Sequence, residues 1–345
     1  MTTTIENIEK ELKTGNLNSF YILYGEELYL LENTERKIKS LFGETIKGIN
    51  FISMNETNIS ELIADMETPA FGYEKKLIIV RNSGLLKKEG RKKNTELVKL
   101  RENINNYITE NYDILKNSII LVIIEDDVDT KYALYKTIEK LGIVCKFDYL
   151  KSAQIEKRIA SICNAYQVKI DLGTIRYFME ACGTNMQDII NEVRKLIEYA
   201  GKGGEITKDS IDKLTIKKIE SVIFDLTDNL GNKETKKALQ VLNNLIYNKE
   251  PLQRILVMLY NHFKKLYFTK IALKYNKDII TSLDLKPNQT FLVNKYKKQA
   301  SYFKENELYV ILQKLRDLDY NYKNGLIDLQ IGLEAILCRY CSKNV

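Results

Sequence analysis

Only three prolines, Pro69, Pro251 and Pro287, occur in the 345 residues of this chain. Proline interrupts helices because it lacks a backbone N–H and its ring clashes with the preceding turn. Long stretches of the sequence can therefore form uninterrupted helix, and their apolar residues recur with the 3.6-residue period of amphipathic helices. The length exceeds what a single core usually supports, so we expect more than one domain.

Short apolar runs rich in branched residues set the first part of the chain apart. They occupy residues 20–24, 77–80 and 119–124. Runs of this kind are typical of parallel strands that are covered on both faces. Stretches with helical spacing, at residues 58–66 and 131–141, alternate with them. The alternation predicts a parallel α/β domain over residues 1–149.

The helical period takes over after residue 150. Three short amphipathic stretches, of which the second ends at Gly183 and the third at Gly201, predict a three-helix domain over residues 150–213. Longer amphipathic stretches follow and predict an all-helical domain over residues 214–345. The predicted fold class is therefore α/β plus all-α.

Composition excludes several classes of protein. No apolar run approaches the roughly 20 residues needed to cross a bilayer, and the N-terminus lacks the apolar core of a signal peptide. Five cysteines, an odd number at irregular spacing, argue against a secreted disulfide framework. We therefore expect a cytoplasmic protein that does not contact membranes. The net charge of +7 fits a protein that works near nucleic acid, although many other proteins share it.

Metal binding is not predicted. Cys338 and Cys341 form the only C-x-x-C pair, and a structural zinc would need two further ligands. The single histidine, His262, lies in a helical stretch and is expected to be packed or on the surface. The acidic residues that follow the run 119–124 could suggest a metal site, but we favour a solvated loop at the end of a strand. These residues are Glu125, Asp126, Asp127 and Asp129.

Gly25 follows the first apolar run, where a nucleotide-binding α/β domain places its phosphate loop. On the G-x-x-x-x-G-K-[ST] template, Leu30 replaces the second glycine, Leu31 the lysine and Glu32 the magnesium-binding hydroxyl. Without the lysine, no point charge meets the β- and γ-phosphates. We therefore predict a degenerate loop that does not bind ATP productively, no catalytic residue and no cofactor.

The segments at residues 20–27, 66–80, 182–196 and 315–325 together resemble the delta-subunit family of bacterial DNA polymerase III. Residues 20–27 resemble its opening strand and degenerate phosphate loop, and residues 66–80 its clamp-binding segment. Residues 182–196 are similar to the family pattern G-x-D-L-x-x-L-x-N-E-L-x-K-L, with Asn and Met in place of Asp and Leu. Residues 315–325 look like its collar motif D-x-x-x-K-x-G.

This resemblance implies a degenerate AAA+ module, with residues 1–149 as its α/β domain and 150–213 as its lid, followed by a helical collar at 214–345. It implies a clamp-loader subunit of the DNA polymerase III holoenzyme that does not hydrolyse ATP. Such a subunit binds the sliding clamp, the beta subunit, and stabilises its open form for loading on primed DNA. The gamma/tau and delta-prime subunits would join through the collar.

Two other functions stay open on the residues alone. An active AAA+ ATPase or helicase-loader subunit would share the architecture but would need the lysine that Leu31 has replaced. A helical nucleic-acid-binding protein that acts alone would bind DNA with a steep dependence on salt.

The resemblance also places Met66, Pro69, Ala70 and Phe71 on a hydrophobic plug that enters a pocket on the clamp. Phe71 is expected to dominate, because some relatives have a leucine where this chain has the small Ala70. Pro69 before the ring and Gly72 after it favour an exposed turn. The other reading is that Phe71 is a core residue at the start of a strand.

Basic residues suggest contacts with DNA in two places. Lys92 and Lys93 lie in a basic run, and Tyr320 and Lys323 lie in the collar motif. Lysines could contact phosphates and the tyrosine could stack on a base. Solvated surface and helix packing are the favoured account of both.

Overall fold

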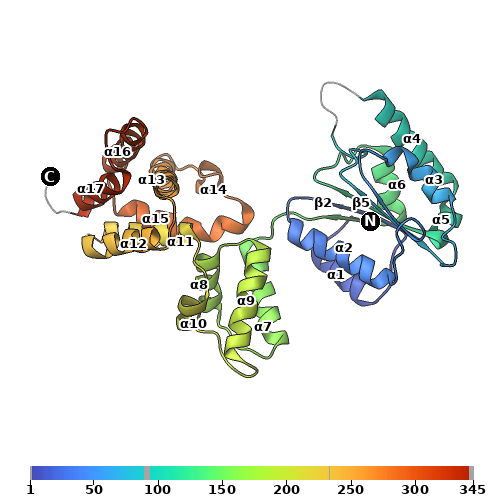
Figure 1. Cartoon of the computed structure of the whole chain (residues 1–345), viewed down its shortest axis with the longest axis horizontal. Coiled ribbons are helices and arrows are strands. Elements are labelled where there is room, and N and C mark those ends of the chain that lie inside the picture. Colours follow the sequence, from blue (N-terminus) through green and yellow to red (C-terminus); the bar gives the residue numbers. More distant parts are fainter. Residues whose placement is uncertain (1, 89–93, 233, 342–345) are drawn as a thin grey trace. The chain divides into compact units, whose positions relative to one another are not determined.

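The computed structural model describes residues 2–88, 94–232 and 234–341 (Figure 1). Its contacts divide the chain into two compact units, Met1–Tyr149 and Leu150–Val345. The finer division of the sequence into three domains, at 1–149, 150–213 and 214–345, stays a prediction.

A parallel sheet forms the centre of the first unit. Within the described residues it has six strands in the order β1-β6-β2-β5-β4-β3. Their bounds are Thr2–Thr3, Phe20–Tyr24, Phe51–Met54, Lys76–Arg81, Ile119–Glu125 and Ile143–Lys146, numbered β1 to β6. The three predicted apolar runs are β2, β4 and β5, which lie side by side and are almost entirely buried. The other three strands are short, and the sequence did not predict them.

Helices precede or connect the strands of this sheet. The two predicted helical stretches are present as a 3₁₀ turn leading into α3 and as α6. Their bounds, with those of the remaining helices, are α1 Ile5–Lys13, α2 Leu28–Phe42, 3₁₀ Ile59–Glu61, α3 Leu62–Glu67, α4 Thr95–Glu110, α5 Tyr112–Ser118 and α6 Ala133–Leu141. The side chain of Asn94 accepts hydrogen bonds from the N–H groups of Glu96 and Leu97, which fixes the start of α4.

The second unit is almost wholly helical, as predicted. Gly183 and Gly201 follow α8 and α9 with φ of 79° and 68°, so both helices end at the predicted glycines. The helices are α7 Ser152–Ala165, α8 Leu172–Cys182, α9 Met186–Ala200, α10 Lys208–Leu214, α11 Ile219–Gly231, α12 Thr235–Tyr247, α13 Leu252–Lys274, α14 Ile279–Ser282, 3₁₀ Pro287–Leu292, α15 Val293–Ser301, α16 Glu305–Lys323 and α17 Leu329–Cys341.

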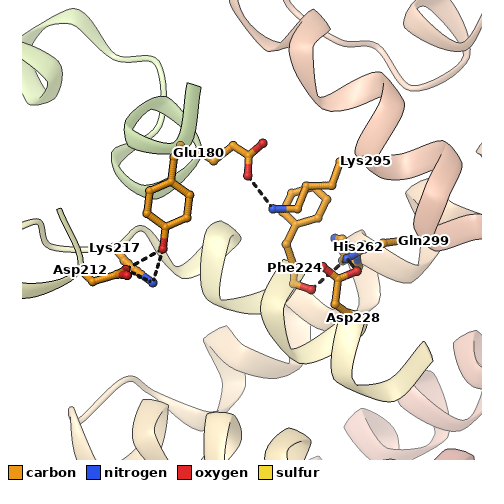
Figure 2. Close-up of polar contacts among 9 residues, drawn as sticks. Glu180, Asp212, Lys217, Phe224, Asp228, His262, Lys295 and Gln299 are labelled. Carbon is orange, nitrogen blue, oxygen red and sulfur yellow. Dashed lines mark hydrogen bonds and ion pairs between the residues drawn. The ribbon is translucent and has the colours of Figure 1, made fainter. Parts of the chain in front are cut away.

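A buried polar network joins three helices inside this unit (Figure 2). The side-chain amide of Gln299 donates to the carbonyl oxygen of Phe224 at 2.9 Å and to Oδ1 of Asp228 at 2.8 Å. Its oxygen, 2.8 Å from His262 Nε2, must therefore accept the proton of that ring nitrogen. Burial, with a smaller effect from neighbouring lysines, lowers the pKa of His262 to about 3. The histidine is thus a neutral core residue at pH 7.

An ion pair also connects helices within the second unit. Nζ of Lys295 in α15 lies 3.0 Å from Oε2 of Glu180 in α8 (Figure 2). The side chains of Lys295 and Glu180 are 19% and 34% exposed, so the pair is partly shielded from water. None of the described helices combines the length and the apolar character needed to span a membrane.

Candidate functional site

A tight turn with an exposed phenylalanine connects α3 to β4. The backbone N–H of Tyr73 donates to the carbonyl oxygen of Ala70 at 2.7 Å, which closes a four-residue turn. Gly72, the third residue, has φ of 81°, as a type II turn requires and as glycine adopts without strain. Phe71, the second residue, is 75% exposed. The phenylalanine therefore lies outside the core, as the flanking Pro69 and Gly72 predict.

A buried lysine holds the base of this turn. Lys76, the first residue of β4, is only 3% exposed. Its Nζ donates to the carbonyl oxygen of Asp65 at 2.8 Å and to Oγ1 of Thr68 at 3.2 Å. The hydroxyl of Thr68 in turn donates to the carbonyl oxygen of Ala64 at 2.8 Å. These bonds attach the end of α3 to the sheet just before the exposed turn begins.

The position of Lys76 also has an electrostatic reason. The last carbonyl groups of a helix have no partner within the helix, and the helix dipole favours a cation there. Burial lowers the pKa of Lys76, and the nearby carboxylate of Asp65 opposes that shift. The sequence pattern alone did not predict a role for Lys76. The available signal was a lone charged side chain at the start of the otherwise apolar run 76–80.

Met66 differs from the other three residues predicted to form the plug. Its side chain is 4% exposed and packs in the core of the first unit, on the same face of α3 as Leu62. In this conformation Met66 cannot touch a partner, which revises its predicted role. Pro69 and Phe71 are exposed and Ala70 is half-buried, so the accessible part of the segment is residues 69–71.

The predicted phosphate loop is a turn of only three residues, 25–27, between β2 and α2. The backbone N–H of Glu27, one of the amides that a phosphate would need, donates to the carbonyl oxygen of Phe147 at 2.8 Å. A Cβ atom built on Gly25 would lie 2.4 Å from the same carbonyl oxygen. The backbone at Phe147 therefore packs directly against the turn, at the place where a phosphate cradle would need free amides.

The template positions that follow lie within α2. Leu30 and Leu31 are 3% and 2% exposed, so the side chain at the lysine position enters the core. Glu32 is exposed. Arg81, at the end of β4, forms an ion pair with Glu35 of α2. A cation at the end of this strand does not supply the carboxylate that a magnesium–nucleotide complex needs.

The acidic run after β5 is only partly solvated, which corrects the prediction. Glu125 is 4% exposed, and its Oε1 accepts a hydrogen bond from Ser83 Oγ at 2.7 Å. Burial raises the pKa of Glu125. Asp127 is exposed and pairs with Lys88 at 2.9 Å. Across residues 2–88, 94–232 and 234–341, no group of three or more histidine, cysteine or acidic side chains could hold a metal ion.

The residues predicted to contact DNA are described only in part. Lys92 and Lys93 lie outside the described residues. Tyr320 is 67% exposed on α16, and Lys323 forms an ion pair with Asp319 at 2.7 Å on the same helix. Both side chains are accessible, and their contact with DNA stays a prediction.

Two family models match the chain. One, "DNA polymerase III, delta subunit", matches residues 21–148, and the other, "DNA polymerase III delta subunit, C-terminal domain", matches residues 220–340. The chain is 27% identical over 347 residues to DNA polymerase III subunit delta of Bacillus subtilis (strain 168), covering 98% of this chain and 97% of the relative. It is 28% identical over 333 residues to the probable DNA polymerase III subunit delta of Aquifex aeolicus (strain VF5), covering 92% and 90%.

A solved structure extends the comparison to three dimensions. The Bacillus subtilis DNA clamp loader delta protein matches with a TM-score of 0.73 and 25% identity, over 98% of this chain and 99% of that chain. Together with the parallel sheet and the helices that follow it, this likeness confirms the predicted fold class, a parallel α/β domain followed by helical structure.

Proposed function

The chain belongs to the delta-subunit family of bacterial DNA polymerase III, and on this premise we propose that it binds the sliding clamp through the turn that carries Phe71. As a component of the clamp loader, it would stabilise the open ring for loading on primed DNA. We propose the gamma/tau and delta-prime subunits as its partners through residues 214–345, and the cytoplasm as its location.

The exposure of Phe71 is the observation that carries this proposal. Burying an aromatic ring of this size is worth roughly 1.5–3 kcal/mol, so an isolated chain gains nothing by holding the ring in water. The type II turn at Gly72 and the hydrogen bonds of Lys76 nevertheless fix the segment on both sides of the ring. An exposed aromatic side chain on a segment whose ends are fixed is the kind of anchor that often dominates a protein interface.

The neighbouring residues take different parts in the proposed contact. Pro69 and Ala70 would lie beside the ring and exclude water, because their side chains are accessible in the same segment. Met66 would support the contact indirectly, because its buried side chain holds α3 against the core of the first unit. We therefore propose residues 69–71 as the contact surface and Met66 as a support.

Opening of the ring would follow from differential affinity. A subunit shifts the equilibrium between closed and open ring only by the difference between its binding free energies for the two forms. A preference of about 1.4 kcal/mol for the open form shifts that equilibrium tenfold. The chain would thus act by binding and not by chemistry.

We also propose that this subunit does not hydrolyse ATP. The three-residue turn, the engaged N–H of Glu27 and the buried Leu31 all support this. The rival function is an active AAA+ ATPase or helicase-loader subunit. Titration of the purified full chain with labelled ATP and magnesium distinguishes them, because saturable binding near micromolar concentrations supports the rival and contradicts our proposal.

A further inference from the structure

The positive charge of the chain is concentrated in one stretch of the second unit. Residues 252–304, which include α13, α14 and α15, contain eleven Lys and Arg but only two Asp and Glu. Their formal net charge is +9, whereas that of the whole chain is +7, so the remaining residues are slightly acidic. A surface of one sign attracts polyanions and raises the rate at which they associate.

An open cleft of about 440 Å³ lies between α13 and α15 of this basic stretch. Lys270, Leu273 and Lys274 of α13 line one side, and Lys297, Ala300 and Ser301 of α15 line the other. Glu305, at the start of α16, is the one acidic residue that lines it.

Two of the three lysines in the cleft have fixed positions. Nζ of Lys270 donates to the carbonyl oxygens of Ala300 and Phe303, at 3.0 Å and 2.6 Å. Nζ of Lys274 lies 2.9 Å from Oε2 of Glu305. Lys297 is exposed, and its ammonium group has no hydrogen bond or ion pair with the described part of the chain. Because Glu305 compensates only one of the three charges, the cleft keeps a net positive charge.

One exposed aromatic ring lies next to Lys274, and another lies on α16, one helical turn after Glu305. Tyr275 is 62% exposed, and Nζ of Lys274 lies 5.8 Å from the centre of its ring. Tyr309 of α16 is 49% exposed, and its ring centre is 6.4 Å from that of Tyr267 on α13. Single-stranded nucleic acid is commonly bound by lysines that contact phosphates and by aromatic rings on which bases stack.

We propose that the cleft between α13 and α15 binds single-stranded DNA, with its lysines contacting phosphates and Tyr275 and Tyr309 stacking on bases. An acidic protein segment would use the lysines but would have no need of exposed rings. A duplex keeps the faces of its bases stacked inside, so the rings favour a single strand over a duplex. The inference rests on the proposed function only in assuming a subunit that works beside primed DNA.

The experiment measures the binding of fluorescein-labelled oligothymidylate to the full chain by fluorescence anisotropy over a series of NaCl concentrations. Lys297→Glu should lower the steepness of the log–log salt dependence by about 0.7 or more, because at least one phosphate contact is lost. Tyr275→Ala should weaken binding by about fivefold or more at constant salt, because one base loses its stacking partner. The melting temperatures of both variants should match that of the wild type.

Matched controls place the same changes elsewhere in the second unit. Lys236→Glu reverses an exposed charge on α12, and Tyr247→Ala removes a ring that is 87% exposed. Both should change binding by less than about twofold. Equal losses in the controls would overturn the proposal, because binding would then depend on overall charge alone. Displacement of the oligonucleotide by polyglutamate as readily as by unlabelled oligothymidylate would also overturn it, in favour of an acidic protein segment.

Clamp binding is measured in parallel with the same proteins. Lys297→Glu and Tyr275→Ala should keep wild-type affinity for the clamp, and Phe71→Ala should keep wild-type affinity for the oligonucleotide. Failure of the proposed DNA-binding cleft can therefore be distinguished from failure of the proposed clamp contact.

Discussion

The ammonium group of Lys76 donates a hydrogen bond to the carbonyl oxygen of Asp65 at 2.8 Å and so joins the first residue of β4 to the end of α3. The exposed segment with Phe71 lies between these two residues in the sequence. Its ends are therefore fixed although its central ring is in water. A segment fixed in this way loses little conformational entropy when a partner binds.

Replacing Lys76 with methionine should weaken clamp binding without abolishing it. The apolar part of the side chain is kept, but the carbonyl oxygen of Asp65 and the hydroxyl of Thr68 lose a donor. We expect affinity to fall by about 1 kcal/mol, roughly fivefold, because the turn becomes less ordered. Surface plasmon resonance on immobilised clamp measures this, and a Lys76→Met chain that binds as tightly as the wild type would contradict the role assigned to the lysine.

Replacing Gly72 with alanine tests the turn itself. No atom lies within 4 Å of the added Cβ, but φ of 81° is strained for alanine. We expect about 1 kcal/mol of backbone strain at this position. The turn should relieve this strain by moving Phe71, and clamp binding should weaken as a result. Gly48→Ala is a matched control, because Gly48 has φ of 83° and equally open surroundings away from this turn. It should lose similar stability, measured by urea unfolding, and keep wild-type clamp affinity.

Restoring the template lysine should not restore ATP binding. Leu31→Lys would bury a charge in the core and destabilise the first unit by several kcal/mol, while the N–H of Glu27 would stay bonded to Phe147. Glu32→Lys adds a lysine at the next, exposed position and should leave stability unchanged. Titration of both variants with labelled ATP should give no saturable binding. Micromolar binding by either variant would contradict the account of this loop.

His262 should make the second unit sensitive to acid. Its pKa is about 3 in the folded chain and about 6.5 when unfolded, so between these values the unfolded chain binds more protons. The stability of the fold is therefore undiminished above about pH 6.5 and falls as the pH drops toward 3. His262→Gln removes this titration. Between pH 7 and 5, the wild type should lose about 1–2 kcal/mol more unfolding free energy than the variant in urea titrations. Equal losses would contradict this assignment.

Much of the fold could be predicted because its signals are local. Fully buried strands such as β2 and β5 are nearly continuous apolar runs, and the exposure of Phe71 follows from Pro69 and Gly72 beside it. Short strands such as β3 have too few residues to show a pattern.

The parts that could not be predicted depend on contacts between distant residues. Glu125 is buried at the end of β5, and Ser83, 42 residues away in the sequence, donates a hydrogen bond to its carboxylate. The turn at Gly25 is closed by Phe147, from the other end of the first unit. Met66 lies next to the exposed segment in the sequence, but the position of its side chain depends on how α3 packs against the sheet.

The affinity of the full chain for purified sliding clamp, compared with that of Phe71→Ala, tests the central claim most directly. We predict a loss of about 2 kcal/mol, roughly thirtyfold, with an unchanged melting temperature, because the ring is exposed and its removal opens no cavity. Tyr247→Ala, which removes another exposed ring, should bind the clamp as the wild type does. Wild-type affinity in Phe71→Ala would contradict the claim that this turn is the clamp-binding site.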